Sequence, residues 1–152
     1  MPVNLLQDAK VERIVFNPFV RAYQSIVPLA ERLGLHIETD NRLSERVLSS
    51  QPLDDWRDRL AETFVNLDIF FEGGESSRVA MKRGVAVLDE ILLQQSTTTS
   101  VIVTHGNLMT LMLKHFDQCI GYTEWENLSN PDVYYLRFID SDISIEQLKK
   151  VS

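Results

Sequence analysis

Residues 97–113, TTTSVIVTHGNLMTLML, join two kinds of secondary structure without a linker. The β-branched run that ends at Thr104 predicts a buried strand over residues 100–104. Apolar residues at helical spacing follow at once and predict a helix from Asn107 to about Phe116. Ligands of open parallel α/β sheets bind beyond the carboxyl ends of such strands, which is where His105 lies. We therefore interpret His105 as a candidate site residue; the alternative is a turn that happens to hold a histidine.

A second junction of strand and helix lies near the amino end of the chain. ERIVF (12–16) predicts a short buried strand, and NPFVRAYQSIVPLAERLG (17–34) predicts the helix that follows it. Asn17 is a suitable N-cap, and Pro18 is a suitable first helical residue. Gly34 is typical of the position just past a helix C-terminus. The two junctions together indicate parallel strands that alternate with helices.

The rest of the chain completes a single α/β domain over residues 1–152, expected as a three-layer α/β/α sandwich with a mainly parallel sheet. Residues 46–74 are the least regular part and are interpreted as a variable lid or insertion segment. The other expected elements are an edge strand at 35–40, a helix from Leu53 to Phe64 begun by Pro52, a long helix after Gly74, and closing strands at 132–138 and 142–148.

Composition narrows the classes of partner. The net charge is −7, which disfavours binding to nucleic acid or to an anionic membrane. Cys119 is the one cysteine, so no internal disulfide is available and a reducing compartment is indicated. The first residues lack a signal-peptide pattern, and no apolar run has transmembrane length. We expect a cytoplasmic protein without metal or cofactor, because no carboxylate, cysteine or histidine cluster has the spacing of metal ligands.

The two junctions predict an anion site. Neighbouring parallel strands end side by side, so Arg21 and His105 should face the same crevice. Helix N-termini present unpaired N–H groups and partial positive charge, and arginine adds a planar fork suited to phosphate. Gly106 allows close approach of a ligand to the backbone, and Asn107 is expected to cap the second helix and to touch the site. A phosphate anion or a phosphorylated small molecule is the expected ligand.

Four segments carry a resemblance to a known family: NPFVRAYQSIVPLAERL, RLSER, GGESS and VIVTHGN. In this order and spacing they resemble the histidine phosphatase superfamily, which is phosphoglycerate mutase-like. The resemblance implies action on phosphomonoesters through a phosphohistidine. It implies that Arg21 and His105 bind the phosphoryl group, and that Glu45 is the general acid. Glu75 and Ser76, within GGESS, are interpreted as helix caps rather than site residues.

The sequence departs from the family at its most characteristic motif. Members of the family begin with a central strand ending in Arg-His-Gly, whose histidine attacks phosphorus, and no such tripeptide occurs here. We therefore expect a chain that lacks the first strand and is inactive as written. A non-catalytic phosphate-binding module and a non-functional gene fragment are the alternatives. An exposed central strand would invite pairing with another chain, so a homo-oligomer is kept as an alternative to a monomer. The substrate, and the choice between phosphatase and mutase, also stay open.

Overall fold

The computed structural model describes residues 11–19, 23–94, 99–129 and 132–148. A three-stranded parallel sheet with the order β2-β1-β3 lies at its centre. The strands are β1 (Val11–Phe16), β2 (His36–Thr39) and β3 (Thr99–Val103). Phe16 pairs with Val103, so β1 and β3 end side by side as expected, and β2 lies at the edge of the sheet as expected.

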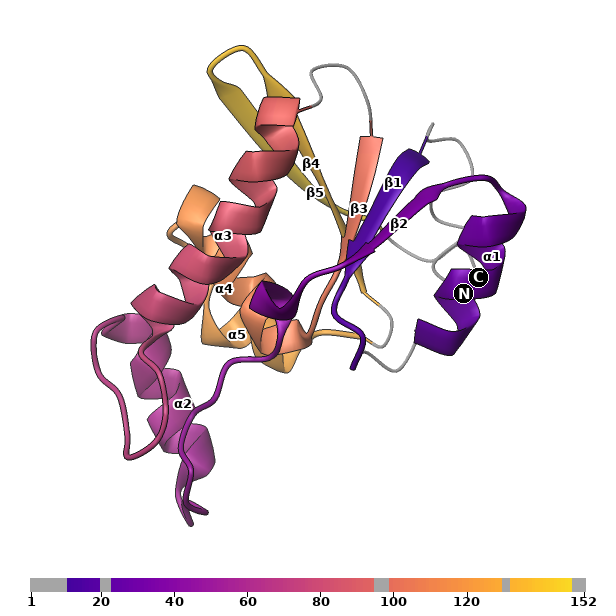
Figure 1. The fold of residues 1–152 in the computed structure, drawn as a ribbon. Coiled ribbons are helices and arrows are strands. Elements are labelled where there is room, and N and C mark those ends of the chain that lie inside the picture. The colour runs from indigo at the N-terminus through magenta and orange to yellow at the C-terminus, as the bar shows by residue number, and fades with distance from the viewer. Residues whose placement is uncertain (1–10, 20–22, 95–98, 130–131, 149–152) are drawn as a thin grey trace.

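Helices cover both faces of this sheet, which confirms the layered α/β fold (Figure 1). α1 (Tyr23–Arg32) packs on one face, where Ala30 joins Ile14 and Phe16 in a small core. α3 (Ser77–Gln94) and α4 (Gly106–Phe116) pack on the other face, around Val15. Alternate residues of β1 thus point to opposite cores, which is the period-two pattern of a strand buried on both sides.

Two expected helix starts are wrong. Pro18 is in a turn and not in a helix; the Asn17 side chain accepts the backbone N–H of Phe19 at 3.1 Å, as a helix-capping asparagine does, but this bond closes a turn. His105 is the N-cap of α4, so Asn107 lies inside the helix instead of capping it. Residue Gly34 does follow the end of α1, with a φ of 71°.

The remaining described helices are one expected helix, in the middle segment, and two short elements elsewhere that the sequence pattern did not predict. α2 (Trp56–Val65) begins three residues later than expected, with Asp55 as its N-cap. The unpredicted elements are a 3₁₀ turn, η2 (Asn41–Leu43), and α5 (Tyr122–Glu126). Both are shorter than two helical turns, so neither carries a readable hydrophobic period.

The closing strands form a separate antiparallel hairpin, β4 (Val133–Ile139) and β5 (Asp142–Leu148). In the described part of the chain this hairpin is not hydrogen-bonded to the parallel sheet. It packs against the end of α4 instead, where the rings of Phe138 and Phe116 lie 5.5 Å apart. None of the described helices is both long and apolar enough to cross a membrane.

Candidate functional site

His105 lies where β3 ends and α4 begins. Its backbone is extended, with φ −91° and ψ 156°, and its carbonyl accepts the N–H of Met109 at 2.9 Å to start the helix. Its ring Nε2 lies 3.1 Å from Oδ1 of Asn17, the residue that follows β1. The backbone N–H of Asn17 also donates to Val103 at 3.2 Å, so the two strand ends are tied together here.

Asn17 lies in this site with a role that the sequence did not predict. It was expected to cap a helix, which is the common role of an asparagine before a proline. The side chain is instead fully buried, and its Nδ2 atom has no hydrogen-bond partner among the described residues. Its position directly after a strand, like that of His105, indicates a place at the crevice but not its partner.

Glu45 reaches the same helix start from a distant part of the chain. Its Oε2 accepts the backbone N–H of Asn107 at 3.0 Å, and its Oε1 accepts that of Leu108 at 2.8 Å. Oε1 also accepts the N–H of Arg46 at 2.9 Å. A carboxylate is favoured at this end of a helix by the unpaired N–H groups and by the helix dipole. Glu45 and His105 therefore share the N-terminus of α4, although 60 residues separate them in the sequence.

Arg46 fastens the segment that carries Glu45. Its side chain is buried, with 6% exposed, and Nη1 donates to the hydroxyls of Ser77 at 2.8 Å and Thr63 at 3.2 Å. Nη2 donates to the backbone carbonyl of Glu75 at 2.5 Å. Burial lowers the pKa of Arg46 below its usual value, although the carboxylates of Glu75 and Glu45 act in the opposite direction. The segment is thus held against the end of α2 and the start of α3.

A second arginine holds the other side of the same segment. Arg83 Nη1 donates to the carbonyls of Arg42 and Ser44, both at 2.7 Å, and its Nη2 donates to Glu75 Oε1 at 2.6 Å. Burial would raise the pKa of Glu75, but the hydrogen bond and charge of Arg83 outweigh it and hold that pKa below the usual value. Glu75 thus pairs with Arg83 across the segment, whereas Ser76 caps α3 as expected by accepting the N–H of Val79 at 3.2 Å.

Three further expectations concern the same region. Arg21 lies outside the described residues, so its place relative to His105 remains a prediction. Gly106 is the first residue of α4, and a Cβ atom there would lie 3.0 Å from the side chain of Leu128. Asn107 is buried, and its Oδ1 has no hydrogen-bond partner in the described part of the chain.

No group of three or more histidine, cysteine or acidic side chains among the described residues is arranged to hold a metal.

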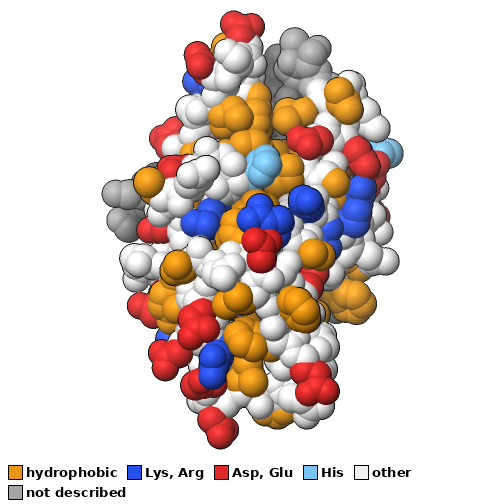
Figure 2. Space-filling model, turned by 90° about the vertical axis from the view of Figure 1, so that its left-hand side faces the viewer, with side chains coloured by type: hydrophobic (Ala, Val, Ile, Leu, Met, Phe, Trp, Pro, Cys, Tyr) orange, Lys and Arg blue, Asp and Glu red, His pale blue; other side chains and the backbone are white. Residues whose placement is uncertain are grey.

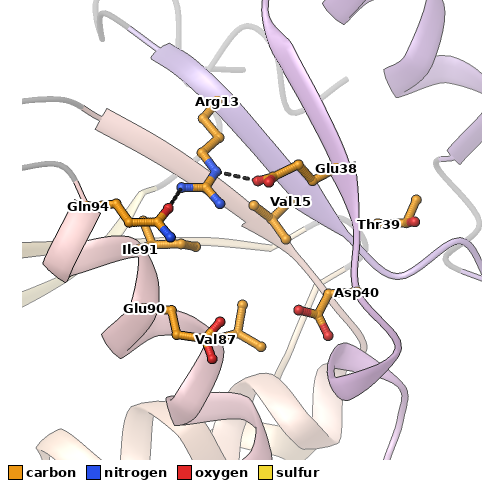
Figure 3. A pocket seen from close by; sticks show the side chains of 9 residues that line it. All are labelled: Arg13, Val15, Glu38, Thr39, Asp40, Val87, Glu90, Ile91 and Gln94. Carbon is orange, nitrogen blue, oxygen red and sulfur yellow. Dashed lines mark hydrogen bonds and ion pairs between the residues drawn. The ribbon is translucent and has the colours of Figure 1, made fainter.

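A polar hollow of about 190 Å³ lies between β1, β2 and α3, and its lining includes none of Asn17, Glu45 and His105. Figure 3 shows Arg13 in it, directed toward Glu38 on one side and Gln94 on the other. Arg42 is bound to the other two acidic residues of the lining, Asp40 and Glu90, at 2.8 and 2.7 Å. The hydrogen bond from Arg42 lowers the pKa of Asp40. Both cations are therefore paired within the protein, and the hollow does not present a free cation to an anion.

The segment expected to be a lid carries exposed apolar side chains. Figure 2 shows hydrophobic side chains among charged ones on the lower half of the face, at the level of α2 in Figure 1, and others on its upper half. Val65 is 89% exposed and Phe70 is 69% exposed. A shallow hollow beside them is lined by one face of α2 and the loop after it, including Ala61 and Ile69.

Comparison with known proteins gives a family and a fold. The profile described as the histidine phosphatase superfamily (branch 1) matches residues 3–150. No curated protein matches the sequence significantly. Among solved structures, YhfR of Bacillus stearothermophilus is similar with a TM-score of 0.75 at 18% identity, over 98% of this chain and 79% of that one.

Two mycobacterial structures are also similar. "Mycobacterial hydrolase 2" has a TM-score of 0.70 at 21% identity, over 98% of this chain and 76% of that chain. Mycobacterial glucosyl-3-phosphoglycerate phosphatase, in complex with VO3, has a TM-score of 0.68 at 21% identity, over 95% of this chain and 78% of that one. At these identities the likeness concerns the fold.

Proposed function

This chain belongs to the histidine phosphatase superfamily (branch 1), and we propose that it binds the phosphoryl group of phosphomonoesters beside His105. The observation that carries the proposal is the meeting of His105 and Glu45 at the N-terminus of α4, beyond the carboxyl end of β3. A histidine can bind a phosphoryl oxygen there, and a carboxyl group next to it can protonate a leaving oxygen. Two of the similar structures hold VO3 and inorganic phosphate, which supports an oxyanion as the ligand.

Each residue has a proposed role. His105 and Arg21 bind the phosphoryl oxygens, with Arg21 assigned from its sequence motif alone. Glu45 is the general acid. Gly106 and Asn107 form the backbone of the site; since the N–H of Asn107 already donates to Glu45, the oxyanion is proposed to lie on the His105 side of the helix start. Neither a metal nor a cofactor is part of the proposal.

A separate proposal concerns catalytic turnover by this chain. Nucleophilic catalysis needs a group that attacks phosphorus, and the family's Arg-His-Gly is absent from the sequence. The remaining histidines, His36 and His115, are both exposed, and neither follows the end of β1 or β3. We propose that the 152-residue chain hydrolyses phosphomonoesters at a rate near background, because losing one member of a catalytic unit commonly costs as much as losing the unit.

Calorimetric titration with inorganic phosphate tests the binding site. The wild-type chain is expected to bind, and both His105→Ala and Arg21→Ala are expected to weaken binding about tenfold or more, since each removes a charge-assisted hydrogen bond. His36→Ala is the matched control. His36 is exposed at the start of β2, where it pairs with Arg13, and so lies away from the carboxyl ends of β1 and β3. Equal affinity in wild type and His105→Ala would refute the site.

A phosphomonoester assay tests the proposal for turnover. Wild-type activity is expected to be near that of buffer, and adding an upstream segment with a strand and Arg-His-Gly is expected to raise it. Robust turnover by the 152-residue chain that His105→Ala abolishes would instead make His105 the attacking residue. The proposed ligand is a phosphorylated small molecule and the proposed compartment is the cytoplasm, in keeping with the acidic composition and the single cysteine.

A further inference from the structure

The Asn17 amide has a defined orientation. Its Oδ1 accepts the backbone N–H of Phe19 at 3.1 Å, and a backbone N–H can only donate, so the atom at this position must be the oxygen and not the NH₂ group. The same oxygen lies 3.1 Å from Nε2 of His105. Two acceptors would not form a hydrogen bond, so Nε2 of His105 must carry a proton and donate it to Asn17.

This proton assignment restricts the rest of the ring. A neutral imidazole carries one N–H, so a proton on Nε2 leaves Nδ1 with a lone pair. No described residue bonds Nδ1, which makes it the ring atom available to a ligand. A lone pair repels an oxyanion, so Nδ1 can meet one only after it has gained a proton. Binding of a fully deprotonated oxyanion must then bring one proton from solvent onto the ring.

We propose that Asn17 is a positioning residue for His105, the residue that binds the oxyanion. Its oxygen holds the ring in the Nε2–H form, so that Nδ1 is the ring atom that meets the ligand and takes up a proton when the ligand binds. The inference rests on the proposed phosphate site and adds which atom of His105 meets the ligand.

The first test reads the tautomer of the wild-type protein and needs no variant. Two-bond ¹H–¹⁵N correlation spectra of labelled protein distinguish Nε2–H from Nδ1–H for each of the three histidines. His105, assigned from the peaks missing in His105→Gln, is expected to be in the Nε2–H form when neutral. A neutral His105 that is mainly in the Nδ1–H form would overturn the inference, whether or not the protein binds phosphate.

The second test uses sulfate, which has no proton to give near neutral pH. Calorimetry in two buffers of different ionisation enthalpy, at a pH where the spectra show a neutral ring, measures the protons taken up. About one proton per sulfate is expected for wild type. In Asn17→Leu, which has a similar volume, neither tautomer is enforced, so proton uptake should fall; affinity should fall about tenfold or more, since a hydrogen bond to a charged group is lost.

Asn66→Leu is the matched control. Asn66 accepts the N–H of Asp68 at 3.1 Å in the same kind of turn, but no histidine lies beside it. Its replacement should leave affinity and proton uptake unchanged. Sulfate binding by Asn17→Leu with wild-type affinity and proton uptake would overturn the inference. A wild-type chain that binds no sulfate would overturn the proposed function, and the tautomer spectrum would then still decide whether Asn17 fixes the ring.

Discussion

Replacing Glu45 should separate the stability of the domain from its affinity for anions. In the native state the carboxylate accepts two N–H groups at the start of α4, those of Asn107 and Leu108, which are buried residues. Glu45→Ala removes the acceptor of both donors and of the Arg46 N–H. The same change removes a negative charge from beside the place where an oxyanion is proposed to bind. Stability should therefore fall while affinity for anions rises.

The magnitude follows from the two buried donors at the start of α4 that lose their acceptor. Leaving one buried donor unpaired costs about 1–3 kcal/mol, and water that enters the space of the lost side chain recovers part of this. We expect Glu45→Ala to lower the free energy of unfolding by about 2–4 kcal/mol. Glu45→Gln keeps one oxygen on the helix and should lower it by about half as much. The vacated N–H groups should in turn bind sulfate, so sulfate should raise the free energy of unfolding of Glu45→Ala more than that of wild type.

Urea unfolding at neutral pH, with and without sulfate, measures both quantities. The matched control is Glu62→Ala, because Glu62 is an exposed residue on α2 with one long ion pair to Arg59. A loss of less than about 0.5 kcal/mol in Glu45→Ala would mean that the carboxylate does not hold the start of α4 in solution. An equal effect of sulfate on wild type and Glu45→Ala would refute competition between this carboxylate and the anion.

Three other changes have defined outcomes. Arg46→Met should lower the free energy of unfolding by about 1–3 kcal/mol in urea, because the carbonyl of Glu75 loses its partner while the buried charge disappears; a loss above about 5 kcal/mol would contradict this. Glu75→Gln should be less stable than wild type at neutral pH, and the difference should shrink as the pH falls below about 4.3, since the folded pKa of Glu75 lies below its unfolded value; a gap that widens in acid would refute the sign. Gly74→Ala should cost about 1–3 kcal/mol in the same assay, because a Cβ atom there would lie 2.1 Å from a backbone carbonyl oxygen; unchanged stability would show that the chain opens easily at this point.

Local patterns in the sequence were sufficient for the main elements. The run that ends at Val103 has β-branched residues and packs as a strand, and the spacing after Gly106 makes a helix, because both signals arise from neighbours a few residues apart. The pairing of β1 with β3 followed from the parallel arrangement that such junctions require. The candidate residue His105 could be identified from the sequence in the same way, since its position is set by the strand that precedes it.

Only the tertiary structure decided what the polar residues of the site do. Asn17 has the local signature of a helix cap, yet its amide bonds His105 from another strand, because burial beside β3 offers it a partner 88 residues away. Glu45 carries no local signal, and it reaches the N–H groups of α4 only because Arg46 and Arg83 hold its segment in place. Hydrogen bonds between distant residues depend on how the elements pack, and a sequence pattern of short period holds no information about them.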